Sequence, residues 1–408
     1  MFQDDAGAST QLLRKINMGA VLRHALEAET FMATEAMAVT GLTRTTVLGL
    51  CDELVDRGWI EEVGDSREAG QYVKGRPARR YRLRNDVGHV VGVDAGQHTV
   101  TAVVSDLRGT ILARATHALD SQDGAARRTT VRAAVDEALG LAAVHPAGVF
   151  LTVIGVPAPV DENGRSPRNN EFWDNMNPDF PTVLADRGET IVDNDANLAA
   201  LAERARGTHG GSFAALLSGE RFGAGLVIDG MLLRGPRGGA GEMRLLNVVE
   251  GVGSTEGLGL LGRQWAVDAS RAGALPSGSI LARIPAEQLS AEAVFNAAAD
   301  GDITALGIVD RLGERLARIA HVLASLLDVD KVIVAGAVAA ALEPVLSKAT
   351  AVLEDHFEAP VPVLAASTLA ADGVVLGALE CGLSAVREQP LSFDPRRQAR
   401  AGEREGRA

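Results

Sequence analysis

Two similar stretches of this 408-residue chain constrain its fold more than any other feature. The first, from His89, reads HVVGVDAGQHTVTAVVSDLRGTILARATHAL, which predicts three consecutive strands with turns after Asp94 and after Asp106. The second, from Ala214, reads AALLSGERFGAGLVIDGMLLRG and repeats the order of strand, glycine-containing turn, strand, Asp-Gly turn and strand. Two such units, about 130 residues apart, predict an internally duplicated α/β fold with two lobes.

Composition and local sequence features indicate where in the cell the protein acts. The chain is 46% hydrophobic and 23% charged, which is ordinary for a soluble protein with a sizeable core. Its acidic start, MFQDDAGAST, has no apolar stretch typical of a signal peptide, and Asp328, Asp330 and Lys331 interrupt the most apolar segment. Its two cysteines, Cys51 and Cys381, exclude a disulfide framework. We therefore expect a cytoplasmic protein without membrane association.

Charge is distributed unevenly along the chain. Residues 1–85 carry 12 Lys and Arg and 12 Asp and Glu, whereas the other 323 residues carry 28 and 41, which accounts for the whole net charge of −13. The basic residues of the first part concentrate in KGRPARRYRLR, residues 74–84, which has six basic residues and no acidic one. This pattern indicates a small nucleic-acid-binding module attached to a larger acidic domain.

The first 60 residues contain a helix-turn-helix pattern. Helical spacing predicts a short helix over about 34–39 and a longer one over about 43–57, joined by a turn at Thr40-Gly41. Helix pairs with glycine turns also occur in ordinary protein cores, so the pattern alone leaves both interpretations open. In a DNA-binding module the start of the second helix would enter the major groove. The candidate DNA-binding residues there are Thr43, which also fits an N-cap, Arg44, Thr45 and Thr46.

Two strands and a basic loop follow the helix pair and favour the DNA-binding interpretation. The segments GWIEEVG and RRYRLRN predict a hairpin. Their connecting loop contains Lys74 and Gly75-Arg76-Pro77, and an extended loop of this kind can place Arg76 in a narrow minor groove. Residues 1–85 are therefore predicted to form a winged helix-turn-helix domain that binds a double-stranded DNA operator.

The chain resembles the ROK family, which groups repressors and sugar kinases on a two-lobed actin-like ATPase fold. The resemblance covers about residues 10–388 and rests on VGVDAG, GVPAPVD, VDNDANLAALAE, FGAGLVIDG, GGAGE and VIVAGAV in the family order. It is similar to the regulator branch, which includes N-acetylglucosamine and xylose repressors. The resemblance implies a homodimer or higher oligomer, a first lobe over 86–205 with about 372–388 and a second lobe over 206–371. Residues 389–408 lack apolar periodicity, so we expect a disordered tail there.

The resemblance also implies candidate ligand-binding residues. In the family's kinases, the Asp of an Asn-Asp-Ala-Asn segment accepts the proton of the attacking sugar hydroxyl, and Asp195 matches it. Asn194 matches the sugar-binding neighbour, Asn170 lies in the segment lining the sugar cleft, and Glu242 is the retained Glu of the glycine-rich segment. The alternative for Asp195 is that it only caps the helix that follows.

Other parts of the kinase site are altered. Gln97 and His98 replace a Gly and a Thr in the first phosphate turn, and Glu220 stands in the second, where its charge would repel phosphate. The family's zinc loop has no cysteine or histidine here, so we expect no metal, and with both turns altered we expect no ATP cofactor. Arg244 would favour an anionic ligand if it points inward, and otherwise it is a surface residue.

Three functions fit these residues. The leading one is a transcriptional regulator, a repressor by resemblance, whose kinase-like domain binds a sugar-like effector without efficient phosphorylation, Asp195 being a vestigial base. The alternative is an active ATP-dependent sugar kinase with an added DNA-binding domain. The third is a DNA-binding protein that acts constitutively and whose pocket is vestigial.

Overall fold

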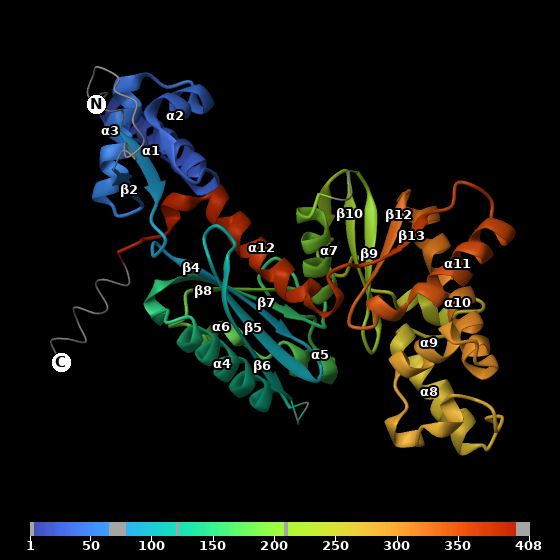
Figure 1. The fold of residues 1–408 in the computed structure, drawn as a ribbon. Helices are drawn as coiled ribbons and strands as arrows, with labels where there is room; N and C mark the ends of the chain where they lie inside the picture. Colours follow the sequence, from blue (N-terminus) through green and yellow to red (C-terminus); the bar gives the residue numbers. More distant parts are fainter. Residues whose placement is uncertain (1–3, 65–78, 120, 122, 208–210, 397–408) are drawn as a thin grey trace, which may run out of the picture.

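The computed structural model describes residues 4–64, 79–119, 121, 123–207 and 211–396, which form a small N-terminal module and two α/β lobes (Figure 1). The lobes lie side by side, and the N-terminal module lies at the end of the first lobe, away from the second. Helix α12 (Gly373–Glu388) runs from the junction of the lobes towards the N-terminal module.

The N-terminal module combines three helices with a small antiparallel sheet of order β1-β3-β2. Gly41 ends the second helix with a φ of 71°, a conformation that favours glycine. The hydroxyl of Thr43 accepts the N–H of Thr46 at 3.4 Å and caps the third helix, so the predicted cap is confirmed. The elements are α1 (Asp4–Glu27), β1 (Phe31–Met32), α2 (Ala33–Thr40), α3 (Arg44–Asp56), β2 (Ile60–Val63) and β3 (Arg80–Leu83).

The first lobe is built on a five-stranded sheet of order β6-β5-β4-β7-β8, in which β4, β7 and β8 are parallel. Alternation along β4 directs Val90 towards Leu379 of α12 and Val91 towards Val131 of α4, so helices cover both faces. The elements are β4 (His89–Ala95), β5 (Thr99–Asp106), β6 (Ile111–Ala118), α4 (Gly124–Leu141), β7 (Val149–Val156), α5 (Glu171–Met176), α6 (Phe180–Val183) and β8 (Glu189–Asn194).

The second lobe repeats this topology with the strand order β11-β10-β9-β12-β13, where the first three strands are again antiparallel and the last two parallel. In both sheets the order is third, second, first, fourth and fifth, which confirms the predicted duplication. The elements are β9 (Phe213–Ser218), β10 (Phe222–Ile228), β11 (Met231–Leu233), α8 (Leu258–Arg271), α9 (Ala291–Ala299), α10 (Ile303–Leu327), β12 (Lys331–Ala335), α11 (Glu343–His356) and β13 (Val363–Ala366).

Helix α7 (Asp195–Ala205) is packed tightly between the lobes. A Cβ on Gly377 of α12 would lie 1.8 Å from the carbonyl oxygen of Leu198, and one on Gly225 of β10 would lie 2.1 Å from that of Ala196. Only glycine allows backbones to approach so closely. The first turns of α7 are therefore held by α12 on one side and by the second lobe on the other.

The core of the N-terminal module continues into the first lobe. Trp59 lies edge-on to Phe150 of β7, with ring centroids 5.8 Å apart, and both belong to one buried cluster with Leu383 of α12. Arg108, in the turn between β5 and β6, donates a hydrogen bond to the carbonyl oxygen of Ala28 at 2.9 Å. The N-terminal module is thus packed directly against α12 and the first sheet.

The segment after α12 differs from the expectation of a disordered tail from residue 389. Pro390–Ser392 forms a 3-10 turn, and the ring of Phe393 stacks on Phe150 with centroids 5.1 Å apart and planes 14° apart. The expectation is wrong there because the segment docks through side chains that show no helical or strand periodicity. Pro390 is buried, and Leu391 and Phe393 pack against the cluster that contains Trp59. Residues 397–408 lie outside the described residues.

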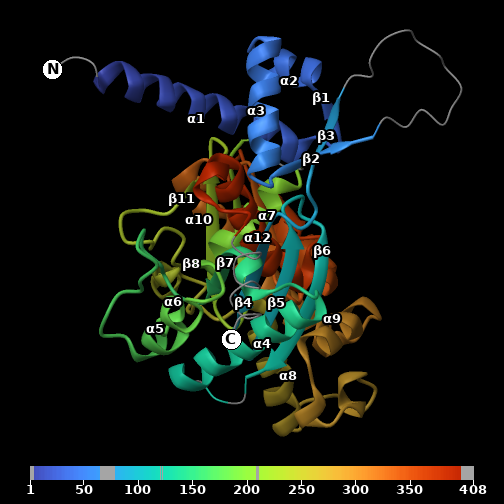
Figure 2. The same cartoon turned by 90° about the vertical axis from the view of Figure 1, so that its left-hand side faces the viewer.

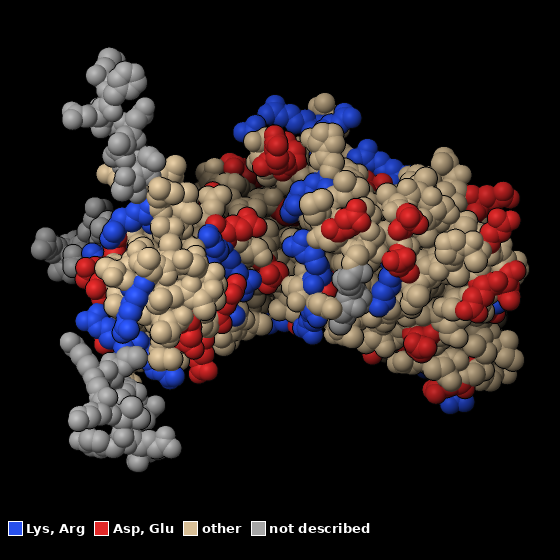
Figure 3. Space-filling model, turned by 90° about the horizontal axis from the view of Figure 1, so that it is seen from above, with Lys and Arg blue, Asp and Glu red and all other residues tan. Residues whose placement is uncertain are grey.

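Charged side chains are spread unevenly over the surface. Figure 3 shows Lys and Arg on the N-terminal module and near the junction of the lobes, whereas Asp and Glu prevail at the far end of the second lobe. Within the described part of the chain, no helix has the length and apolar character needed to cross a membrane.

Candidate functional site

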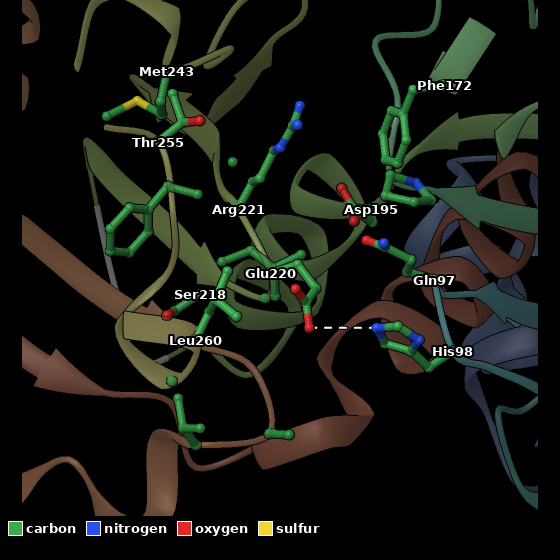
Figure 4. Close-up of a pocket in the computed structure, with 18 of the residues that line it drawn as sticks. Gln97, His98, Phe172, Asp195, Ser218, Glu220, Arg221, Met243, Thr255 and Leu260 are labelled. Atoms are coloured by element: carbon green, nitrogen blue, oxygen red, sulfur yellow. Dashed lines mark hydrogen bonds and ion pairs between the residues drawn. The ribbon is translucent and has the colours of Figure 1, made fainter. Parts of the chain in front are cut away.

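A cavity of about 710 Å³ lies between the lobes (Figure 4). This volume falls within the roughly 300–1,000 Å³ typical of small-molecule sites. The first lobe contributes the turn after β4, the start of α5 and the start of α7, and the second lobe contributes the turn before β10 and the segment before α8. All four predicted ligand-binding residues line this cavity: Asn170, Asn194, Asp195 and Glu242.

Asn194 and Asp195 stand where β8 runs into α7. Asn194 is the N-cap of α7, because its side-chain oxygen accepts the N–H of Asn197 at 3.1 Å while its side-chain nitrogen donates to the carbonyl oxygen of Ala158 at 3.1 Å. Asp195 accepts the N–H of Ala196 at 2.7 Å and faces the cavity. The capping role proposed as an alternative for Asp195 therefore falls to Asn194.

The carboxyl of Asp195 lies in an environment that disfavours its charge. Burial raises its pKa to about 8, and the nearby carboxyls of Asp94 and Glu242 add to the increase. Burial also raises the pKa of Asp94 to about 7, against the positive charges of Arg114 and Arg127. At neutral pH, Asp195 can therefore donate or accept a hydrogen bond with a ligand hydroxyl, and a pKa near 8 is also compatible with a general base.

The other two predicted residues lie on opposite lobes. Asn170 caps α5 by accepting the N–H of Trp173 at 3.2 Å. Glu242 lies beside β10, where Gly241 has a φ of 84° and packs against the backbone of Ala224. Burial raises the pKa of Glu242, and the positive charges of Arg244 and Arg221 oppose this increase. Asn170, Asp195 and Glu242 could thus contact a ligand from two sides.

The structure adds two arginine–aromatic pairs that the sequence did not predict. The guanidinium carbon of Arg221 lies 5.3 Å from the ring centroid of Phe172, and that of Arg244 lies 4.7 Å from the ring of Trp173. Both arginines belong to the second lobe and both rings to α5 of the first, so these pairs bridge the lobes. The aromatic pair Phe172-Trp173, which begins two residues after the cleft residue Asn170, was the signal available in the sequence.

The two altered phosphate turns meet at the cavity. His98, from the turn after β4, and Glu220, from the turn before β10, form an ion pair at 3.3 Å when His98 is protonated, and a hydrogen bond otherwise (Figure 4). Their side chains occupy the approach between the two turns. Glu256 does not line the cavity, and its backbone carbonyl accepts a hydrogen bond from Arg315 at 2.8 Å.

The residues of this chain do not provide the ligands for the structural zinc ion that the family resemblance implies. The segment from Glu242 to Gly257 has no cysteine or histidine. Across the described ranges, no group of three or more His, Cys, Asp or Glu side chains could hold a metal ion.

Four of the six candidate DNA-binding residues lie in the described part of the structure. Thr43, Arg44, Thr45 and Thr46 are exposed around the first turn of α3. The buried face of α3, with Val47, Leu50, Cys51 and Leu54, packs inward, so this polar turn faces solvent. Lys74 and Arg76 lie outside the described residues.

Solved structures of other proteins share the fold of this chain. A solved ROK family glucokinase from Streptomyces griseus, in complex with glucose and AMPPNP, matches with a TM-score of 0.60 and 23% identity over 72% of this chain and 99% of its own. A ROK family transcriptional regulator, a homologue of the E. coli MLC protein, matches with a TM-score of 0.64 and 21% identity over 92% of this chain and 98% of its own. The two duplicated lobes therefore form an actin-like sugar-kinase fold.

The family follows from the sequence match. The ROK family model matches residues 90–381, and the chain belongs to the ROK family. It is 27% identical to the xylose repressor of Caldicellulosiruptor bescii over 57% of this chain and 58% of the repressor's length. It is also 31% identical to the glucokinase of Halalkalibacterium halodurans over 66% of this chain and 85% of the glucokinase.

Proposed function

We propose that this chain is a DNA-binding transcriptional repressor whose kinase-like lobes bind a sugar or sugar derivative without phosphorylating it efficiently. The observation that carries the proposal is the N-terminal module, in which α2, the turn at Gly41, α3 and the paired strands β2 and β3 follow one another. This order is that of a winged helix-turn-helix. The similarity to xylose repressors supports both the DNA target and a sugar effector.

The DNA-contacting surface would be the first turn of α3 together with the loop after β2. Arg44 and Thr46 would meet base edges in the major groove, and Arg76 would reach the minor groove. We assign residues 1–85 to this domain, 86–205 with 372–388 to the first lobe, and 206–371 to the second. A homodimer would present two such modules to a two-fold symmetric operator.

Ligand binding would reach the DNA-binding module through α7 and α12. The cavity residue Asp195 begins α7, which is packed without space against α12 at Gly377. The C-terminal half of α12 shares a buried cluster with Trp59 of the N-terminal module. A ligand that binds one lobe arrangement more tightly than the other would shift the two modules of a dimer relative to each other.

An ATP-dependent sugar kinase with an added DNA-binding domain is the second candidate. Asp195 and the similarity to a glucokinase favour it. The carboxylate of Glu220, which contacts His98 across the two turns, argues against it, because its negative charge would repel the phosphates of a nucleotide. An ATP turnover assay over a panel of sugars separates the two. Turnover above about 1 per second, abolished by Asp195→Asn, would replace the regulator proposal.

DNA binding is tested with the full chain and a duplex selected by it from a random pool. Arg44→Ala should weaken binding by about tenfold, because it removes a contact at the start of the recognition helix. Arg57→Ala is the matched control, since Arg57 lies at the other end of α3 and pairs with Glu53 at 2.6 Å. Equal effects of the two changes would contradict the proposed orientation of α3.

If no sugar, sugar phosphate or sugar acid changes the melting temperature, the pocket is vestigial and the repressor is constitutive.

A further inference from the structure

Two arginines in the cavity have no role in the proposed function so far. Arg221 precedes β10, and Arg244 opens the 3-10 segment Arg244–Val248; both line the cavity with exposed side chains. Among the described side chains, neither arginine has a carboxylate at ion-pair distance. Each is instead held over the ring of Phe172 or Trp173.

This placement leaves the hydrogen-bonding edges of both guanidinium groups available to a ligand. A cation–π contact uses the positive charge of the guanidinium group and none of its N–H groups as partners of an acceptor oxygen. The planar fork of N–H groups matches a carboxylate or a phosphate. Figure 4 shows Arg221 extending into the space between Met243 and Phe172, next to Asp195.

Among the described residues, the carboxyl groups of the cavity form no ion pair with the two arginines. The raised pKa of Asp195, about 8, leaves this group mostly protonated at neutral pH. The carboxylate of Glu220 contacts His98 at 3.3 Å, and among the described contacts it forms no ion pair with either arginine. Glu242 is the remaining counter-charge, and burial raises its pKa while Arg244 and Arg221 lower it. In the described part of the chain, neither guanidinium group therefore has a carboxylate as a direct partner, and the acidic group of a ligand could take that place.

We propose that the effector is an anionic sugar derivative, a sugar acid or a sugar phosphate, whose acidic group binds between Arg221 and Arg244 while its hydroxyls face Asp195. This inference deepens the proposed function and rests on it. The arginines come from the second lobe and the rings from the first, so an anion that draws the guanidinium groups away from Phe172 and Trp173 changes a contact between the lobes. Recognition of the charge and movement of the lobes would thus share the same side chains.

The test is titration calorimetry on the full chain with matched probes built on glucose, galactose and mannose. Each set contains the neutral sugar, its uronic acid and its 6-phosphate, measured at low and high salt. The variants are Arg221→Gln, Arg244→Gln and both together. Arg311→Gln is the matched control, because its guanidinium lies 3.8 Å from the ring of Trp265 but outside the cavity.

We expect at least one acid or phosphate to bind more tightly than its neutral parent, with an affinity that falls as salt rises. The double variant should lose about tenfold or more of that affinity, while Arg311→Gln leaves it unchanged. Whichever probe binds more tightly, the uronic acid or the 6-phosphate, identifies the acidic group of the effector. If neutral sugars bind as well as their acids and phosphates, or the double variant binds anions normally, the inference is wrong and a sugar-responsive repressor remains. If no probe binds, both this inference and the proposed sensing of sugars are wrong. The proposed DNA binding is unaffected by that result, because it is measured separately.

Discussion

Replacing Asp195 by Asn should stabilise the protein, and increasingly so as pH rises. Asn has the same shape and can still accept the N–H of Ala196, which Asp195 accepts at 2.7 Å. The change removes an ionisable group whose pKa is raised from 3.8 to about 8, chiefly by burial and then by Asp94. Because the pKa is higher in the folded chain than in the unfolded chain, ionisation opposes folding. This cost is absent below pH 3.8 and complete above about pH 8.

The size of the effect follows from the shift. At about 1.36 kcal/mol per pKa unit, a rise from 3.8 to about 8 sets a ceiling of about 6 kcal/mol above pH 8. Between pH 6 and pH 9 the ceiling on the change is about 3 kcal/mol, because part of the cost is already present at pH 6. The cavity is open to water, so we expect about 1–2 kcal/mol over this interval.

The assay is urea unfolding of the full chain at pH 6, 7, 8 and 9, with the wild type and Asp195→Asn compared at each pH. Asp174→Asn, on the exposed face of α5, is the control for a change of one surface charge. The stabilisation by Asp195→Asn should grow up to about pH 8 and then level off. A constant difference across the series, or a destabilisation that grows with pH, would refute the argument that Asp195 is held in a charge-disfavouring cavity.

Four further substitutions test other parts of the structure. Gly377→Ala should destabilise the protein by about 3 kcal/mol or more in urea unfolding, because the added Cβ would lie 1.8 Å from the carbonyl oxygen of Leu198. Gly140→Ala in α4 is the control and should stabilise the protein by about 0.5–1 kcal/mol, because no atom lies within 4 Å of the added Cβ. Arg108→Ala should speed amide exchange in the last turns of α1 and weaken any effector response of DNA binding, and unchanged exchange would contradict the packing of module on lobe. Thr43→Ala should cost about 1 kcal/mol through loss of the α3 cap, visible as a lower melting temperature; no change would count against the cap.

Much of the fold could be predicted because its signals are local. The turns after Asp94 and Gly219 are flanked by apolar runs that read as strands, and this pattern indicated the duplication before any sheet was seen. Turn and cap chemistry placed the end of α2 at Gly41 and the start of α3 after Thr43. These features depend on neighbours in the chain, which is why sequence reasoning reached them.

Features that depend on distant partners were missed. Leu12 and Ile16 of α1 fall at helical spacing, but this spacing does not say whether another element covers them. They are 60% and 54% exposed where α1 projects from the module (Figure 2). The arginine–aromatic pairs join residues of different lobes, for example Arg244 and Trp173, so no local pattern encodes them. The pairing of His98 with Glu220 likewise needed the two turns to be brought together.

The central claim is that a ligand in the cavity changes DNA binding without phosphoryl transfer. The direct measurement is the affinity of the full chain for its selected duplex, by fluorescence anisotropy at fixed salt, as sugars, sugar acids and sugar phosphates are titrated in the absence of ATP. We predict that at least one ligand weakens DNA binding by about tenfold, within the range typical of allosteric coupling, and that Asp195→Ala reduces this response. DNA affinity that stays constant with every ligand, or that changes only when ATP is added, would contradict the account.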